Sequence, residues 1–344
     1  MELDTIRART LRRLTWIVRA GVIIGVAGTV WMLWPAQDAD ASFRPRVETP
    51  AFVTPINSER FTTFSARWPR IAIDEGHANV HTADGRYQPF ARLMERDGFR
   101  VVSNGGRITP EALRNIDIFV TANALGYRGM AQMLADRVGF GRLVRFDVDA
   151  FDDDEIARLA GWVTQGGRAL IVADHAPAAN ASQRLAAAFG VAMTTWWAED
   201  SAHSDGGNPA TLVFSRENGL LGEHAILRGR NAAEQITRVM TFTGQALKPG
   251  PNSEVLLRLS ATAREYPFRV SREQQGRSAA GLAQAVAVRF GAGRVVVMGD
   301  AAALTAQRIE TPGAAPYLMG MNRLGTDNQQ FTLNIARWLM GVLE

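Results

Sequence analysis

The sequence predicts an α/β fold with a mostly parallel sheet. Short continuous apolar runs recur along the chain, such as residues 116–123 and 294–298, and segments with helical spacing of apolar residues separate them. Uninterrupted Val, Ile and Leu runs are typical of parallel strands covered on both faces. Several of these runs end in polar residues, as expected where an open α/β sheet places its ligands. Alternation of this kind favours a wound sheet.

The elements are expected in a regular order after residue 67. The expected strands are residues 70–74, 99–103, 116–123, 168–173, 211–214, 236–242, 254–260, 283–290 and 294–298. The expected helices are residues 87–97, a helix that starts at Pro110, and residues 156–164, 182–189 and 329–343. Residues 124–150 are expected to form a long excursion, and residues 191–208 an irregular segment. Residues 209–290 carry strands without obvious helices between them, which indicates a β-rich, antiparallel insertion.

Local signals fix several helix ends. Thr109 is expected to cap the helix that begins at Pro110. The acidic run 152–155 precedes a helix and is interpreted as capping rather than as a metal site. Gly166 is placed to end that helix. Asp327 and Asn328 are interpreted as the start of the last helix.

Composition and charge exclude several classes of function. Hydrophobic residues make up 47% of the chain and charged residues 21%, which is typical of a globular protein. The chain has no cysteine, so disulfides, thiolate metal sites and a cysteine nucleophile are excluded. The net charge is +4, of which +3 lies before Trp34. The remainder is nearly neutral, so no nucleic-acid partner is predicted.

The N-terminus carries one long apolar stretch. Residues 14–34 are interrupted only by Arg19. A spanning helix needs about 20 apolar residues and a signal-peptide core about 7–15. We expect a single-pass anchor in the lipid bilayer; a cleaved signal peptide and a buried core helix are the alternatives. The basic residues of segment 1–13 place the N-terminus in the cytoplasm. The domain 68–344 then lies outside the cytoplasm in the periplasm, after a linker at 35–67.

Polar side chains gather where the expected strands end. Residues 70–87 place a short strand directly before an acidic and imidazole-rich loop, and later strands end in further polar residues. The candidate ligand-binding residues are Asp74, Glu75, His77, Asn79, Asn123, Asp174, His175, Asp300 and Asn328. Parallel strands would bring the groups that follow them to one edge. Each group also has an ordinary structural role open to it, such as capping a helix or tying a loop.

A metal site is the alternative interpretation of this cluster. Asp74, His77, Asp174 and His175 have the donor types that hold a divalent metal and an activated water. His203 and Asp205 form a further polar pair in the irregular segment, and His224 is interpreted as a surface or loop residue. No cofactor is predicted; a divalent metal is the one candidate.

Four motifs together resemble a known family. They are IAIDEGHANVH at 71–81, RALIVADHAPAAN at 168–180, AVRFGAGRVVVMGDAAALTA at 287–306 and GTDNQQFTLNIARWL at 325–339. In this order they resemble the bacterial domain of unknown function 4350 and its relatives, which are similar to class I glutamine amidotransferase domains. Auxiliary proteins of gliding-type ABC transporters and intraflagellar-transport proteins share the general pattern. The resemblance implies a flavodoxin-like three-layer sandwich over residues 68–344.

The resemblance does not carry amidotransferase chemistry to this chain. That chemistry needs a cysteine on a strand-to-helix elbow. Here the strand 168–173 leads into Asp174 and His175 instead, and Ser182 lies on the expected helix. We therefore expect a ligand-binding or interaction module of the cell envelope, with a small molecule or sugar as ligand and a membrane transport or envelope complex as partner. A metal-dependent hydrolase of envelope material is the alternative.

Overall fold

The computed structural model describes residues 46–47, 68–137, 148–267, 276–310, 313 and 315–344 of the chain. Residues 46–308 and 317–344 belong to one compact unit. The expected anchor at 14–34 lies outside the described residues, as does nearly all of the expected linker. Within the described part of the chain, no helix is both long and apolar enough to cross a membrane.

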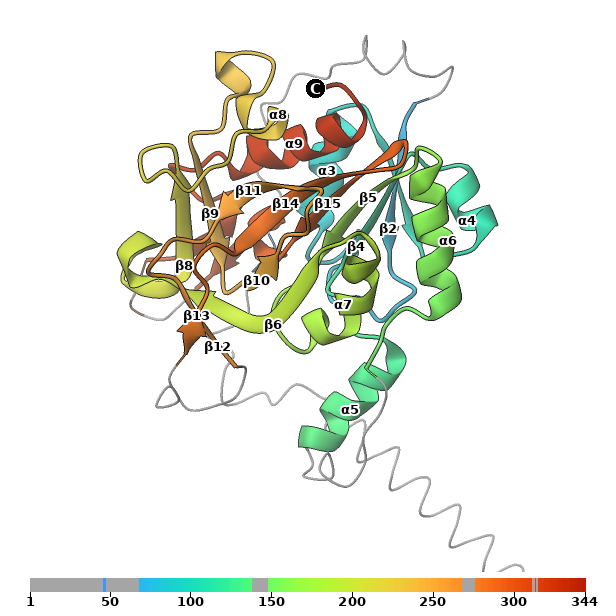
Figure 1. The fold of residues 1–344 in the computed structure, drawn as a ribbon, viewed down its shortest axis with the longest axis horizontal. Helices are drawn as coiled ribbons and strands as arrows, with labels where there is room; N and C mark the ends of the chain where they lie inside the picture. Colours follow the sequence, from blue (N-terminus) through green and yellow to red (C-terminus); the bar gives the residue numbers. More distant parts are fainter. Residues whose placement is uncertain (1–45, 48–67, 138–147, 268–275, 311–312, 314) are drawn as a thin grey trace, which may run out of the picture. The chain divides into compact units, whose positions relative to one another are not determined.

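One sheet of 11 strands forms the centre of the described fold, in the order β13-β12-β6-β10-β14-β15-β5-β4-β2-β3, with β11 paired to β14 (Figure 1). The parallel half comprises β2 (Arg70–Asp74), β3 (Arg100–Asn104), β4 (Ile118–Ala122), β5 (Arg168–Val172) and β15 (Gly293–Met298). The antiparallel half comprises β6 (Ala192–Glu199), β10 (Gln245–Lys248), β11 (Ser253–Arg258), β12 (Arg264–Tyr266), β13 (Arg277–Ser278) and β14 (Ala283–Phe290).

The α/β class is therefore correct, but the expectation of a mostly parallel sheet is wrong, because the sheet is mixed. Each parallel neighbour, from β15 through β5, β4 and β2 to β3, pairs in continuous register. From β14 outward every pairing is antiparallel. A parallel pair needs a long crossover connection that usually contains a helix, and the chain between β6 and β15 contributes strands with only short helical segments between them.

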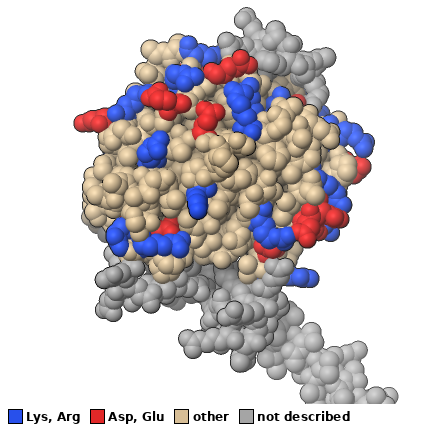
Figure 2. Space-filling model, viewed as in Figure 1, with Lys and Arg blue, Asp and Glu red and all other residues tan. Residues whose placement is uncertain are grey.

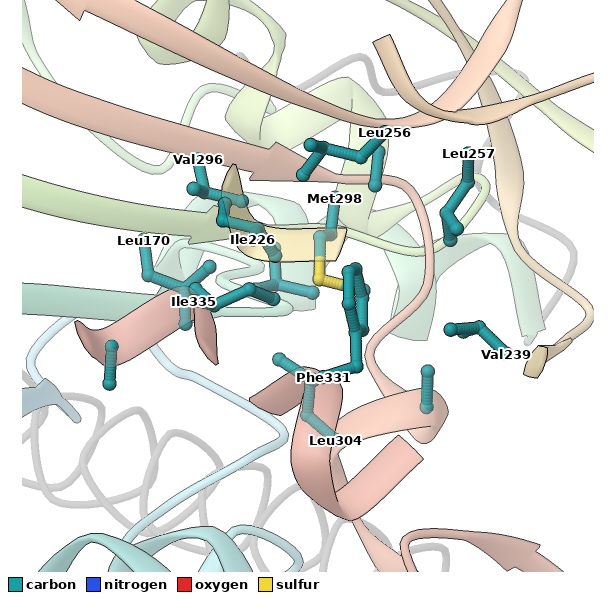
Figure 3. Packing of buried hydrophobic residues seen from close by; sticks show 14 of the residues in the cluster. Leu170, Ile226, Val239, Leu256, Leu257, Val296, Met298, Leu304, Phe331 and Ile335 are labelled. Carbon is teal, nitrogen blue, oxygen red and sulfur yellow. The ribbon is translucent and has the colours of Figure 1, made fainter. Parts of the chain in front are cut away.

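Helices cover both faces of this sheet. One face packs α3 (Gln88–Arg96), α8 (Ala225–Arg228) and α9 (Asn328–Leu339), and the other packs α4 (Pro110–Arg114), α6 (Asp153–Thr164) and α7 (Ala178–Ala188). The helix α5 (Tyr127–Arg137) follows β4. In the first core, Phe331 of α9 packs beside Met298 of β15 and Leu304 (Figure 3).

Two small sheets and three short 3₁₀ turns complete the described fold. They are β7 (Ser204–Asp205), β8 (Asn208–Ser215) and β9 (Arg238–Phe242) in one sheet, and β1 (Arg46–Val47), β16 (Ala306–Ile309) and β17 (Tyr317–Gly320) in the other. The turns are η2 (Ser201–His203), η3 (Ala232–Glu234) and η4 (Ala302–Leu304). Apolar side chains of β8 and β9 join the core under α9.

Three of the predicted helix-end signals are confirmed. Thr109 accepts a hydrogen bond from the backbone N–H of Ala112. Asp152 and Glu155 form a reciprocal capping box at the start of α6. Gly166 follows that helix in the left-handed region, at φ 106°.

One further expectation is wrong, and two are confirmed only in part. The segment 191–208 is not irregular, because it contains strand β6; the Thr and Trp side chains of that strand are half-buried, so no clear alternation marks it. Asp327 and Asn328 start α9 as expected, with Asp327 at the N-cap position, but the carboxylate of Asp327 accepts hydrogen bonds from the N–H groups of Thr237 and Arg238 instead of from α9. His224 lies in a loop directly before α8, but it is not at the surface, because it is buried, caps α8 and packs edge-on against Trp338.

A buried ion cluster ties α9 to α3. The guanidinium of Arg337 donates two hydrogen bonds to Asp97 (2.6 and 3.0 Å) and one to Glu234 (2.9 Å). Arg230 also pairs with Glu234. Arg337 is 2% exposed and Asp97 is fully buried. The cluster therefore joins three distant segments of the chain through charges that are removed from water.

Candidate functional site

The carboxyl edge of the parallel strands gathers the candidate residues. Asp74 ends β2, Asn123 follows β4, Asp174 follows β5 and Asp300 follows β15. Because these strands are parallel neighbours, all four residues lie at one edge of the sheet. The loop after β2 covers part of this edge, since the N–H of Val80 donates to the carbonyl of Asn123.

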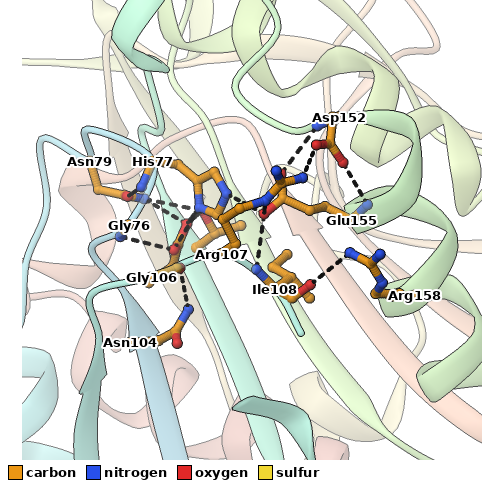
Figure 4. A network of polar contacts seen from close by, with 12 residues as sticks. Gly76, His77, Asn79, Asn104, Gly106, Arg107, Ile108, Asp152, Glu155 and Arg158 are labelled. Atoms are coloured by element: carbon orange, nitrogen blue, oxygen red, sulfur yellow. Dashed lines mark hydrogen bonds and ion pairs between the residues drawn. The ribbon is translucent and has the colours of Figure 1, made fainter. Parts of the chain in front are cut away.

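His77 is held between two carboxylates in a network that Figure 4 shows in part. Its Nδ1 lies 2.8 Å from Oδ1 of Asp74, and its Nε2 lies 3.1 Å from Oε1 of Glu155. Asp74 also accepts hydrogen bonds from Asn79 and from the hydroxyl of Thr121. All polar groups of His77 are thus engaged within the protein, which suits a positioning role better than contact with a ligand.

The two carboxylates change the titration of His77. Burial lowers the pKa of His77, but the hydrogen bonds and negative charges of Asp74 and then Glu155 outweigh burial and leave this pKa above 6.5. A histidine whose folded pKa is raised stabilises the fold at low pH. That stability is fully present below the unfolded pKa and is lost as the pH rises through the folded pKa.

We therefore expect the unfolding free energy to fall above about pH 6.5, and His77→Gln to remove this part of the pH dependence. Urea unfolding at a series of pH values measures it. His203→Gln, at a half-exposed histidine bonded to Asp200, is the matched control. Equal pH profiles for the wild type and His77→Gln would contradict the assignment.

Asp174 and Asp300 form a second group of polar residues. Asp174 lies at the elbow, the turn through which β5 leads into α7. Asp174 accepts hydrogen bonds from the side-chain amide of Asn123 (2.6 Å) and from the N–H of Ala301 (2.5 Å). Asp300 accepts from the N–H groups of Phe242 (2.6 Å) and Ala303 (2.7 Å). Two carboxylates therefore fasten together the loops that follow β4, β5 and β15 and the end of β9.

The two elbow carboxylates perturb each other. Burial and then the charge of Asp174 raise the pKa of Asp300 to about 8, against three backbone N–H donors that lower it. Burial also raises the pKa of Asp174, while hydrogen bonds from Ala301 and Asn123 lower it. Like charges in a dry site disfavour double ionisation, so the pair holds a proton near neutral pH.

Backbone strain accompanies this edge. Asn123 has φ 47°, Ala78 in the covering loop has φ 52°, and Thr195 of β6 has φ 68°. For the β-branched Thr195 this conformation is a true outlier. Its N–H donates to the side chain of Gln245 and its carbonyl accepts from the N–H of Ala176 beside the elbow. Strain held in place by such contacts is typical of functional sites.

Two buried polar groups beneath the loop lack a hydrogen-bond partner among the described residues. They are Nδ1 of His81 and the hydroxyl of Tyr87, whose rings meet edge-on at 5.0 Å. Burial raises the pKa of Tyr87, and the charges of Asp174 and Asp300 add to this effect. Burial, with a smaller contribution from Arg86, lowers the pKa of His81 to about 3. The Tyr87 hydroxyl therefore lies within electrostatic reach of the elbow.

The four metal-ligand candidates do not form one cluster. Asp74 and His77 bind each other, whereas Asp174 belongs to the elbow and Nδ1 of His175 contacts the carbonyl of Ala176 at 2.7 Å. Among the described residues, no group of three or more His, Cys, Asp or Glu side chains is arranged to hold a metal ion.

The remaining candidates have structural contacts. Glu75 accepts hydrogen bonds from Ala83 and Ser103 and so holds the covering loop to β3. Asn328 bonds the backbone of Met240 and of Ala303, next to the elbow. His203 pairs with Asp200, while Asp205 pairs with two arginines, so they do not act on each other.

Sequence reasoning missed Glu155, Gln245 and Tyr87. Glu155 stands in an acidic run whose capping role hid its second contact, to His77. Gln245 donates to the carbonyls of Ala173 and Asp174, but nothing near it in the sequence marks it. Tyr87 could have been found as a large polar aromatic residue at a helix start beside the polar loop.

Comparison with known proteins supports the fold alone. No family model matches the chain, and no curated protein matches it. The chain is similar to a solved structure described as the mmIFT52 N-terminal domain, with 12% identity and a TM-score of 0.53 over 79% of this chain and 97% of that one.

Two further solved structures are similar to the chain at lower TM-scores. A ThuA-like protein from Bacteroides uniformis has 13% identity and a TM-score of 0.41, over 80% of this chain and 93% of that one. A protein from Thermoplasma acidophilum described as part of a GMP synthase has 8% identity and a TM-score of 0.38, over 80% of this chain and 96% of that one. The family named from the four motifs stays a prediction, and what the comparisons establish is a mixed-sheet α/β fold shared with the mmIFT52 N-terminal domain.

Proposed function

We propose that this chain is a ligand-binding module of amidotransferase-like fold whose ligand contacts the elbow after β5. The observation that carries the proposal is the state of Asp174 at that elbow. A catalytic elbow presents a free nucleophile to its substrate. Here the elbow carboxylate is fastened by Asn123 and by the N–H of Ala301, and the chain has no cysteine. The elbow is thus built as a rigid polar platform.

The chemistry around the elbow suits a small polar molecule such as a sugar. The rings of His175 and Trp197 meet edge-on at 5.9 Å, and Asp174 lies next to His175 in the chain. Binding sites for small molecules combine apolar and aromatic surface with a few placed polar groups.

The charge distribution favours such a ligand over a polyanion. On the described part of the face in Figure 2, Lys and Arg side chains are interspersed with Asp and Glu side chains, and the charges of one sign do not form a large continuous area. Nucleic-acid binding draws its affinity from clustered positive charge. Interspersed charges of both signs supply little of that attraction.

Ligand screening by thermal shift tests the proposal. We expect mono- and disaccharides or small polar metabolites to raise the Tm of the full chain, and Asp174→Asn to weaken this effect. Asp84→Asn, at an exposed loop position, is the control. Turnover of any such compound would contradict a binding role. Divalent cations belong in the screen, because stabilisation by a cation that depends on Asp74 would favour the metal-dependent hydrolase instead.

The proposal includes a location. Residues 14–34 anchor the module in the bilayer, and residues 68–344 face the periplasm, where the module serves a transport or envelope complex. The apolar length of the segment and the arginines before it support this. Alkaline extraction of membranes tests the anchor, and protease accessibility in spheroplasts tests the side; release of the chain by alkali would contradict the anchor.

The strained backbone at Thr195 gives a separate prediction. Glycine adopts positive φ without a steric penalty, so Thr195→Gly should raise the unfolding free energy by about 1 kcal/mol. Thr194→Gly, at a neighbour in the same strand whose φ is not positive, should lower it. Urea unfolding compares the two. A loss of stability in both variants would show that Thr195 is not strained.

A further inference from the structure

The edge strand β3 presents unpaired backbone groups. Among the described residues it is the last strand of the sheet order and pairs only with β2. The N–H of Arg100 donates to the carbonyl of Pro69, and the carbonyl of Asn104 accepts from the N–H of Glu75. Backbone groups of alternate residues in a strand point to the same side. Arg100, Val102 and Asn104 therefore bond inward, whereas the N–H and C=O groups of Val101 and Ser103 point away from the sheet.

Within the described part of the chain, this edge lacks the features that usually protect an edge strand. Proteins guard exposed edges with Pro, Lys, bulges or covering segments. The sequence of β3 is RVVSN, its pairing with β2 is regular, and Arg100, Val102 and Ser103 are exposed. Val102 is one of the few large apolar side chains exposed in the described part of the chain, at 39%. A groove lined by Val101 and Ser103 on one side and Ala91, Arg92 and Glu95 of α3 on the other runs along the edge.

We propose that two copies of this chain pair through β3 about a two-fold axis, which extends the sheet from one copy into the other. The two β3 strands then run antiparallel with Val102 opposite Val102 of the second copy. Val101 faces Ser103 of the second copy, and Ser103 faces its Val101. Each of these two Val101–Ser103 pairs exchanges two backbone hydrogen bonds, so the dimer gains four backbone hydrogen bonds.

The register follows from the backbone. If the two-fold axis passed through Val101 or through Ser103, only that one outward-pointing residue of β3 would face an outward-pointing β3 residue of the second copy. Centring on Val102 matches both. It also places Arg100 opposite Asn104 of the second copy, so no like charges meet. The exposed Val102 side chains meet each other in the non-hydrogen-bonded pair, where strands approach most closely.

The helix beside the edge supports a second copy as the occupant. Arg92 and Glu95 lie on the groove side of α3 and pair with each other at 3.0 Å while both remain largely exposed. A two-fold axis brings the same face of α3 from each copy to the junction. Arginine and glutamate on one face are complementary to a copy of that face, because each charge finds its opposite across the axis.

A cysteine cross-link tests the register directly, since the chain contains no cysteine. In a non-hydrogen-bonded antiparallel pair the Cα atoms lie about 4.5 Å apart, within the range that a disulfide spans. Val102→Cys in the full chain should therefore form a disulfide-linked dimer under mild oxidation. Arg100→Cys is the matched control, because it places two exposed cysteines about 14 Å apart along the strand direction. Cross-linking that is absent from Val102→Cys, or equal in both variants, would overturn the proposal.

The backbone contribution is tested by proline. Ser103→Pro removes the side-chain hydroxyl and also the backbone N–H, which has no partner among the described residues of a single copy. Ser103→Ala removes the hydroxyl but keeps the N–H. Sedimentation of the detergent-solubilised full chain should show a dimer for the wild type and Ser103→Ala, and at least a tenfold weaker dimer for Ser103→Pro. Circular dichroism and Tm establish that both variants fold. A wild type that stays monomeric across the concentration range overturns the proposal, whatever other molecule binds this edge.

Discussion

Arg337→Met should be the most destabilising single change considered, lowering the unfolding free energy by about 3–5 kcal/mol. The guanidinium of Arg337 is buried between Asp97 and Glu234, and its removal leaves a buried carboxylate without a counter-charge. Methionine keeps most of the side-chain volume, so the loss reflects charge rather than a cavity. Guanidinium chloride unfolding of the two proteins measures the difference.

Two further variants show whether the loss of stability in Arg337→Met comes from the lost ion pairs or from lost side-chain packing. Arg92→Met breaks an exposed ion pair and should change stability by less than about 0.5 kcal/mol. Adding Asp97→Asn to Arg337→Met removes the uncompensated charge, so the double variant should be more stable than Arg337→Met alone. If Arg337→Met costs no more than Arg92→Met, the cluster does not stabilise the fold as its geometry indicates.

The second large effect concerns pH. Burial and the charge of Asp174 raise the pKa of Asp300 to about 8, far above the ordinary value of 3.8. An acid with a raised folded pKa stabilises the fold fully below its unfolded pKa, and that contribution is lost as the pH rises to the folded pKa. We expect the unfolding free energy to decline between pH 4 and pH 8, by about 1.4 kcal/mol per unit of pKa difference and so on the order of 5 kcal/mol.

Asp300→Asn isolates this contribution. The variant should be less stable at pH 4, because an amide cannot accept from Phe242 and Ala303 with both of its polar atoms. Its stability should nevertheless change much less with pH than that of the wild type. Urea unfolding from pH 4 to 8 measures both profiles, and Asp84→Asn controls for the loss of a carboxylate. Parallel profiles in the wild type and Asp300→Asn would refute a proton held at the elbow.

The elements that could be predicted from the sequence are those whose side chains lie in the same surroundings along their whole length. The strands β4 and β15 are apolar along their length because both faces are covered, and α6 carries its own capping signals. The antiparallel half was harder to find. In β6 the side chains are half-buried, and β10 begins with a buried glutamine, so neither strand shows the apolar run or the alternation that reveals a strand.

The site was predictable in place but not in detail. That Asp74 and Asp174 lie at one edge follows from polar residues placed after apolar strands. The contact of His77 with Glu155 spans 78 positions, and that of Asp174 with the N–H of Ala301 spans 127. Which residues meet over such separations depends on the order of the strands and on the path of the loops. Local patterns in a single sequence reveal neither of these.

The side chain of Gln245 joins the two halves of the sheet at the elbow. Its amide nitrogen donates to the carbonyl of Ala173 at 2.9 Å, while its oxygen accepts from the N–H of Thr195 at 3.0 Å. If the elbow moves, either a hydrogen bond of the Gln245 side-chain amide breaks or the backbone of Thr195 moves with the elbow. Trp196 and Trp197 follow Thr195 directly. A movement of the elbow at Asp174 that shifts Thr195 should therefore change the fluorescence of these two indoles.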